Sequence, residues 1–359
     1  MFLPGATTHG HYQIELECAV CHTESFTTKS EFQGACLKCH GDELNTAEDS
    51  HPPSKFESPR NAERTKALDA RHCITCHSEH QPGRTGTMGL SIPQDYCFHC
   101  HQDIGKERAS HQGLAFDSCA NAGCHNFHDN RALYEDYLLR HASEPSIRPS
   151  AQRQVLAFRP CPSTLRARLN EQTPLSGCRG CHQSETTGWL SGRHGMRVGQ
   201  GLSPFSVGQS RLSMKKGAAH KQLTCASCHA FGDGGAQATQ VNACLSCHND
   251  EHSLAYQNSK HAIMFKAESA GSTPSGRGTS CATCHMPVRE DDDGKLSVQH
   301  NQNDNLRPNE KMVRSVCAQC HGLTFTLDAL ADRALVEKNF SGQPSTHVQS
   351  VDFAVARDE

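Results

Sequence analysis

His220–His261 reads HKQLTCASCHAFGDGGAQATQVNACLSCHNDEHSLAYQNSKH and contains the pattern Cys-x-x-Cys-His twice, at Cys225–His229 and Cys244–His248. This pattern is the attachment signal of c-type haem. The two thiols bond to the vinyl groups of one porphyrin, and the histidine that follows binds the iron from one face. A histidine from elsewhere in the chain can bind the opposite face. Three further histidines lie in this stretch: His220, His252 and His261.

The same pattern recurs along the whole chain. It occurs nine times, and a tenth copy, Cys119–His125, has four residues between its cysteines. The ten copies use all of the 21 cysteines except Cys161. The predicted thioether cysteines are Cys18, Cys21, Cys36, Cys39, Cys73, Cys76, Cys97, Cys100, Cys119, Cys124, Cys178, Cys181, Cys225, Cys228, Cys244, Cys247, Cys281, Cys284, Cys317 and Cys320. The predicted proximal ligands are His22, His40, His77, His101, His125, His182, His229, His248, His285 and His321.

Two other uses of paired cysteines are less favoured. Zinc sites contain Cys-x-x-Cys pairs, and disulfides form in exported proteins. Neither needs a histidine directly after the second cysteine, whereas here a histidine follows in every copy. Longer spacers such as that of Cys119–His125 occur in multihaem cytochromes, so we count it as a site. Cys161 is expected to be a free, partly buried thiol, with an intermolecular disulfide as the alternative.

Histidines outnumber the axial positions that need them. The chain has 25, so ten proximal ligands leave fifteen for ten distal positions. All ten irons can therefore have two histidine ligands. Such a closed iron cannot bind substrate, and it changes redox state with little rearrangement of its ligands, which favours electron transfer over catalysis.

The distal ligands are predicted from their positions between the motifs. The second half offers His194, His220, His252, His261 and His300 for its five haems. His252 and His261 lie nine residues apart and should serve different haems. The first half has a surplus, from which we favour His11, His51, His80, His111 and His128. His9, His72 and His141 are in reserve, His99 lies inside an attachment loop, and His347 lies in the tail, where it could serve a neighbouring molecule or nothing.

The composition fits a chain that packs around porphyrins. Only 35% of the 359 residues are apolar, with a single Trp, which is little for a core of its own. The formal net charge of −3 omits the haem propionates, so the holoprotein should be more acidic. No basic run suggests nucleic acid, and no stretch is long enough to span a membrane.

Cysteines at this density indicate export, and covalent haem attachment in bacteria occurs outside the cytoplasmic membrane. We therefore expect a periplasmic, cell-surface or extracellular protein. The sequence begins MFLPGATTHG without a signal peptide, so we expect its start to be a trimmed one. The expected partners are other redox proteins or copies of itself, with an outer-membrane porin or an extracellular acceptor as further options.

The motifs divide the chain into two pentahaem halves. We predict an N-terminal domain over 1–141, a linker over 142–177, a C-terminal domain over 178–342 and a mobile tail over 343–359. The fold class should be mainly α, with extensive coil and little or no β. Helices are predicted over 131–141 and about 324–339, and polar loops over 232–235, 270–280 and 289–305. Asp291–Gly294 is expected to be a solvated loop, with a calcium site as the alternative.

Residues 178–340 resemble the C-terminal haem-packing core of the multihaem cytochromes related to hydroxylamine oxidoreductase. Residues 1–141 are similar, in a generic way, to small multihaem cytochromes c. The resemblance of 178–340 depends on Trp189-x4-His194, on His220 upstream of Cys225, on Asn249–His252 leading to Tyr256, Ser259 and His261, on the Cys-His-Met-Pro form at Cys284–Pro287, and on His300 followed by Arg307-Pro308.

The chain departs from these enzymes where their chemistry occurs. In hydroxylamine oxidoreductase the catalytic haem is five-coordinate and cross-linked to a Tyr, whereas no Tyr follows the last motif here. Nor does the chain contain the Cys-x-x-Cys-Lys variant that nitrite reductases often use. The count of ten is also similar to that of the periplasmic decahaem cytochromes that sit in an outer-membrane porin.

Three hypotheses follow. We favour a decahaem electron conduit with closely packed bis-histidine haems. The first alternative is a subunit of a polymeric extracellular filament. The second is an oxidoreductase acting on hydroxylamine, nitrite or a sulfur oxyanion, which needs one iron without a distal histidine.

Overall fold

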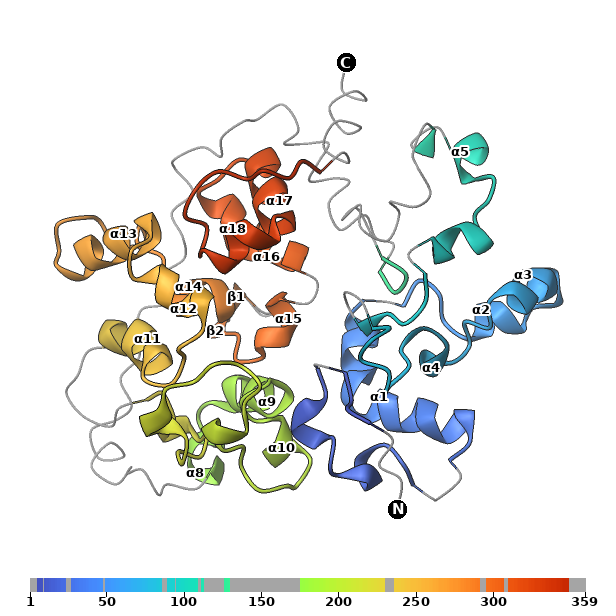
Figure 1. The fold of residues 1–359 in the computed structure, drawn as a ribbon, viewed down its shortest axis with the longest axis horizontal. Coiled ribbons are helices and arrows are strands. Elements are labelled where there is room, and N and C mark those ends of the chain that lie inside the picture. Colours follow the sequence, from blue (N-terminus) through green and yellow to red (C-terminus); the bar gives the residue numbers. More distant parts are fainter. Residues whose placement is uncertain are drawn as a thin grey trace. The chain divides into compact units, whose positions relative to one another are not determined.

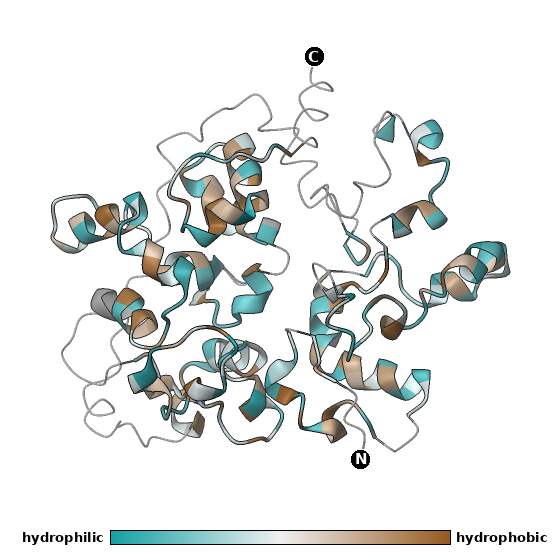
Figure 2. Ribbon diagram, viewed as in Figure 1, coloured by the Kyte–Doolittle hydropathy of each residue, from teal (hydrophilic) through white to brown (hydrophobic). Residues whose placement is uncertain are grey.

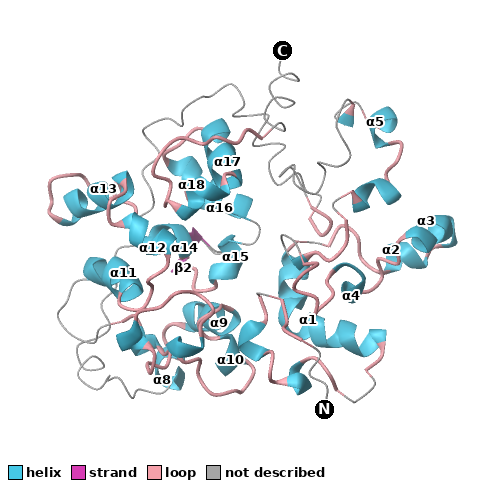
Figure 3. Cartoon of the chain, in the orientation of Figure 1, coloured by secondary structure: helices cyan, strands magenta, loops and turns pink. Residues whose placement is uncertain are grey.

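The computed structural model is a set of short helices joined by long loops, with one small hairpin (Figures 1 and 3). It describes residues 5–8, 10–23, 27–47, 49–85, 89–93, 95–108, 111–112, 126–129, 175–229, 236–290, 295–306 and 309–348. The chain divides into two compact units. The N-terminal unit comprises residues 1–143 with 348–359, and the C-terminal unit comprises residues 144–347.

The described part of the N-terminal unit contains one long helix and several single turns. The helices are α1 (Lys29–Thr46), α2 (Ser54–Glu57), α3 (Ala62–Ala67), α4 (Cys73–Cys76) and α5 (Ile104–Glu107). Turns of 3-10 helix cover Tyr12–Ile14, Cys18–Val20, Pro59–Asn61 and Tyr96–His99.

Helix α1 begins at a capping box. The Thr28 side chain accepts from the backbone N–H of Glu31, and the Glu31 carboxylate accepts from that of Thr28 at 2.6 Å. These bonds satisfy two donors at the start of the helix, which are otherwise unpaired. The result is a stable platform for the second attachment motif, which lies within this helix.

The described part of the C-terminal unit contains helices and the hairpin. Its helices are α8 (Leu175–Arg179), α9 (Gln183–Ser191), α10 (Met196–Gly199), α11 (Ala236–Leu245), α12 (Glu251–Tyr256), α13 (Lys260–Ser269), α14 (Cys281–His285), α15 (Gln302–Leu306), α16 (Met312–Ser315), α17 (Leu323–Ala331) and α18 (Arg333–Glu337). Strand β1 (Val288–Glu290) pairs antiparallel with β2 (Leu296–Val298), with Val288 opposite Val298. Turns of 3-10 helix cover Val207–Gln209, Lys216–Ala218, Cys225–Ser227, Asn309–Lys311 and Cys317–Gln319.

The predicted fold class, mainly α with extensive coil and little β, is confirmed, but two local predictions are wrong. The stretch 289–305 was expected to be a loop and contains the hairpin and α15. The helix expected over about 324–339 is two helices, because Asp332 ends α17 and caps α18, accepting from the Leu335 N–H at 3.0 Å. In the described start of the expected tail, Ser345 bonds to Asp332 at 2.7 Å and His347 to Asp328 at 3.1 Å, and the mobility of the tail stays a prediction.

Several predictions concern segments outside the described residues. These are the long-spaced motif Cys119–His125, the helix over 131–141, the free thiol Cys161, the loop Gly232–Gly235, the acidic loop Asp291–Gly294, the reserve ligands His9 and His141, most of the linker, and the tail beyond residue 348.

Buried apolar side chains are unevenly divided between the units. In the C-terminal unit they gather around α16, α17 and α18, where Val313, Leu323, Leu327 and Leu335 are at most 5% exposed. Burying one such side chain contributes about 1.5–3 kcal/mol. In the described part of the N-terminal unit, Ile14 (6% exposed) and Tyr96 (7%) are the only buried hydrophobic side chains. Apolar residues elsewhere form short separate stretches (Figure 2). None of the described helices is long and apolar enough to cross a membrane.

Helix α10 packs against α9 at a site that only glycine fits. A Cβ on Gly195 would lie 2.4 Å from the Trp189 carbonyl oxygen and 2.5 Å from its ring. We expect Gly195→Ala to destabilise the C-terminal unit by about 1–3 kcal/mol, the usual cost of overpacking. Thermal unfolding followed by circular dichroism measures this as a lower Tm. Gly217→Ala is the control, because a Cβ there meets nothing within 4 Å. Equal Tm values for the two variants would contradict this packing.

Candidate haem sites

Each described attachment motif forms one turn of helix. The backbone N–H of the histidine donates to the carbonyl of the first cysteine, at 2.7 Å for His22, 2.9 Å for His77 and 2.9 Å for His229. Residues three and four positions apart lie on the same face of such a turn. The Cys-x-x-Cys-His spacing therefore presents two thiols and one imidazole to the same side. None of the described cysteines forms a disulfide.

Eight proximal histidines have a second histidine ring opposite them. Most partners come from segments distant in the sequence. In the N-terminal unit the ring centroids are 5.9 Å apart for His11–His40, 6.3 Å for His22–His80, 6.2 Å for His51–His101 and 6.5 Å for His77–His128. In the C-terminal unit they are 6.4 Å apart for His194–His248, 6.2 Å for His229–His300, 6.1 Å for His252–His285 and 6.1 Å for His261–His321.

These distances match two imidazoles that share one metal. Each imidazole nitrogen bonds a transition metal at about 2.0 Å, so two rings on opposite sides of one ion have centroids about 6 Å apart. Rings in direct aromatic contact lie 4.5–7 Å apart as well. The distance between ring centroids alone is therefore not sufficient for a haem assignment. The assignment also depends on the attachment motif, to which one histidine of every pair belongs.

The opening stretch of the sequence connects four of these pairs. Its own proximal ligands, His229 and His248, face His300 and His194. Its extra histidines face other motifs, His252 opposite His285 and His261 opposite His321. The structure thus places His252 and His261 at different sites.

Two predicted distal ligands are not placed in this way. His125, the proximal ligand of the long-spaced motif, lies outside the described residues, so its pairing with His111 stays a prediction. By count, His182 and His220 would form the remaining pair. Both lie within the described residues, and their pairing stays a prediction.

Most distal histidines are held through their Nδ1 atoms. An imidazole whose Nδ1–H donates to a fixed acceptor presents its Nε2 lone pair to a metal in a set orientation. The acceptors are the carboxylates of Glu79 for His11 (2.7 Å) and Asp49 for His128 (3.0 Å), and the backbone carbonyls of Gly5 for His80 (2.9 Å), Val298 for His300 (2.8 Å), Val336 for His252 (2.5 Å) and Phe127 for His51.

Burial keeps two of the ligands neutral. It lowers the pKa of His194 to about 4, assisted by the charge of His248. It also lowers the pKa of His285 to about 4, assisted by His252. Both rings are therefore neutral at pH 7, and the neutral imidazole is the form that binds a metal.

The Nε2 of His252 accepts a hydrogen bond from the Asn339 amide at 3.1 Å. This hydrogen bond would have to break before the Nε2 of His252 could bind an iron.

The residues around these pairs fit an apolar prosthetic group. The N-terminal unit has almost no side-chain core of its own among its described residues. Leu37 (40% exposed) and Phe98 (38%) lie inside attachment motifs, and Ile263 (61%) follows His261 by two residues. A porphyrin at each pair would cover such side chains and complete the interior.

Some neighbouring motifs present their first cysteines to each other. The thiols of Cys36 and Cys73 shift each other's pKa, as do those of Cys244 and Cys281, and Cys178 adds to the effect of burial in raising the pKa of Cys225. Two of these pairs have further support from side-chain bonds. Gln33 in α1 accepts from the Cys73 N–H at 2.9 Å, and Gln240 in α11 accepts from the Ser280 hydroxyl at 2.8 Å.

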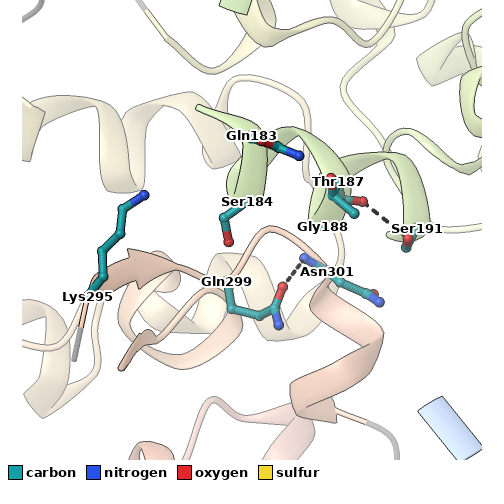
Figure 4. Close-up of a pocket in the computed structure, with 8 residues that line it drawn as sticks. All are labelled: Gln183, Ser184, Thr187, Gly188, Ser191, Lys295, Gln299 and Asn301. Carbon is teal, nitrogen blue, oxygen red and sulfur yellow. Dashed lines mark hydrogen bonds between the residues drawn. The ribbon is translucent and has the colours of Figure 1, made fainter. Parts of the chain in front are cut away.

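A polar hollow of about 500 Å³ lies beside the sixth motif, between α9 and the residues around β2. Lys295 lies at the opposite end of it from Ser191 (Figure 4). The hollow is lined by Gln183, Ser184, Thr187, Gly188, Ser191, Lys295, Gln299 and Asn301. Since these include no cysteine or histidine, the hollow is not one of the paired-histidine sites.

The Nδ1 acceptors were missed by reasoning from the sequence. Part of the signal was available, because Glu43 follows His40 by three residues and Asp250 follows His248 by two. An acidic residue that soon follows a proximal histidine can accept its Nδ1–H. The acceptors from distant segments, such as Glu79, left no such local signal.

His261→Ala tests a single axial pair. His261 lies on α13, where alanine keeps the helix, and its ring faces His321 at 6.1 Å. We expect the variant to retain all its haem and to show one five-coordinate, high-spin haem, about one-tenth of the total, by electron paramagnetic resonance. His99→Ala is the control, since His99 lies exposed inside an attachment loop. High-spin signal in the control, or none in His261→Ala, would contradict the pairing.

The family model of cytochrome c3 matches residues 10–102. This range contains the four motifs that begin at Cys18, Cys36, Cys73 and Cys97, and the axial pairs His11–His40, His22–His80 and His51–His101. No curated protein and no solved structure matches the chain, so the resemblance of residues 178–340 stays a prediction. Taken with the attachment motifs, the similarity of residues 10–102 to cytochrome c3 supports a multihaem c-type cytochrome that transfers electrons.

Proposed function

We propose that the protein is a decahaem relay that carries electrons through closed, bis-histidine haems. The observation that supports it most directly is the set of eight histidine pairs, with ring centroids 5.9–6.5 Å apart. An iron with two histidine ligands has no open position for a substrate. Its ligands need not rearrange on reduction, which keeps the barrier to electron transfer low.

The contacts between motifs support movement of electrons from haem to haem. Each thioether sulfur is bonded to a carbon attached directly to the porphyrin ring. Two sulfurs that lie near each other therefore bring two porphyrin edges close together. Helix α1 packs against α4, and α11 against α14, which would bring the second haem near the third and the eighth near the ninth. The influence of Cys178 on the pKa of Cys225 would likewise place the sixth haem near the seventh.

The compartment and partners are also proposals. The number of attachment motifs argues for a place outside the cytoplasmic membrane, where covalent attachment of haem occurs in bacteria. Its partners there would be other redox proteins, an outer-membrane porin, an extracellular acceptor or further copies of the chain.

The oxidised and reduced spectra of the holoprotein test the relay. We expect low-spin signals only, and no change when nitrite, hydroxylamine or sulfite is added. A ligand that perturbs about one-tenth of the haem spectrum would overturn the closed relay and favour an oxidoreductase.

Light scattering across a range of protein concentration tests the filament alternative, which requires the molecular mass to grow with concentration.

A further inference from the structure

The axial pair His11–His40 differs from the other seven in its Nδ1 acceptors. His40 donates its Nδ1–H to the Glu43 carboxylate at 3.1 Å, and His11 donates to that of Glu79 at 2.7 Å. In each of the other described pairs, at most one of the two histidines donates its Nδ1–H to a carboxylate. His128 donates to Asp49 while its partner His77 faces the carbonyl of Gly89 at 3.3 Å.

Glu79 is held rigidly in its place. Besides the Nδ1–H of His11, it accepts from the Thr8 N–H at 2.7 Å and from the Thr8 hydroxyl at 2.9 Å. Its side chain is only 28% exposed, so little water screens its charge. Glu43, with a side chain 43% exposed, is screened more and should act more weakly.

A carboxylate acceptor affects an iron ligand differently from a carbonyl. It draws the Nδ1 proton toward itself, makes the imidazole more basic and adds negative charge near the iron. The ferric state carries one more positive charge than the ferrous state, so both effects stabilise the ferric state. The reduction potential is therefore lowered. The one basic residue inside this attachment loop, Lys38, has the opposite effect, but it is exposed and well screened.

We propose that Glu43 and Glu79, acting through His40 and His11, set the haem at Cys36 and Cys39 to the lowest reduction potential among the four at Cys18, Cys36, Cys73 and Cys97. Both glutamates are positioning residues, since they touch the ligands and not the iron. The inference rests on the proposed relay. Helix α1, which carries Cys36, packs against α4, which carries Cys73, so this haem lies near the next one along the relay. With the lowest potential, it would be the last of the four to accept an electron and the first to give it up.

Potentiometric titration of the complete holoprotein, followed at the α-band, tests the proposal. In Glu79→Gln we expect one low-potential component, about one-tenth of the absorbance change, to move upward. The expected change is about tenfold in its reduced-to-oxidised ratio at fixed potential, which is about 59 mV for one electron. Glu43→Gln should move the same component less. Glu63→Gln is the matched control, because it removes the same charge from an exposed pair with Lys66 in α3.

Thr8→Val separates tuning from structural support. It removes a hydroxyl that shares the Glu79 carboxylate with His11, leaving more negative charge for the histidine. We expect the same component to move downward, opposite to Glu79→Gln. Shifts of the same sign in both variants would mean that Glu79 only supports the fold and would overturn the proposal.

Two further outcomes would also overturn it. One is a Glu79→Gln titration that overlays the wild type at unchanged haem content. The other is a new high-spin signal in that variant, which would show that Glu79 holds His11 in place and does not tune it. These failures differ from failure of the relay, because a high-spin haem in the wild-type protein would contradict the relay alone.

Discussion

The structure depends on pairs of imidazoles whose ring centroids lie about 6 Å apart. Each pair joins two segments that are not neighbours in the sequence, such as His22 with His80 or His229 with His300. With an iron between them, the rings would act as cross-links that close loops in the chain, much as disulfides do. A chain with little apolar core has few other ways to offset the entropy of folding.

The secondary structure follows from this constraint. Helices as short as α4 and α14 gain little from their own hydrogen bonds, because nucleating a helix is unfavourable. Their function is to turn two thiols and one histidine to the same side. Where the chain does form a conventional core, around α16, α17 and α18, it uses leucines and a valine that are almost fully buried. The two units therefore differ in how they are stabilised, although both carry the same motifs.

The attachment sites could be predicted from the sequence because their geometry is local. Spacings of three and four residues correspond to one helical turn, so the spacing in the sequence already indicates which side chains lie on the same face. The pairing of distal ligands is not local. Any of several histidines in the first half could have faced His77, and nothing near His128 marks it as the partner. The acceptors behind the ligands are harder still to predict, since Glu79 and His11 meet only after the chain has folded.

Predictions from hydrophobic periodicity were wrong where a single side chain ended the helix that the pattern predicted. The apolar spacing of 324–339 is helical throughout, yet Asp332 accepts from the backbone N–H of Leu335 and starts a new helix. The same carboxylate binds Ser345 and holds the chain that follows. Capping bonds of this kind compete with continuation of a helix, and hydrophobic periodicity does not detect them.

The interleaved pairing also bears on how such a protein matures. A chain delivered from its N-terminus exposes the cysteines of its first motif long before His80 arrives to face His22. His77 must likewise wait for His128, and His229 for His300. Haem joined early would therefore carry irons open on one side until each unit is nearly complete. Only then would these irons close, so the period of greatest reactivity toward oxygen and small ligands falls during assembly and not in the finished protein.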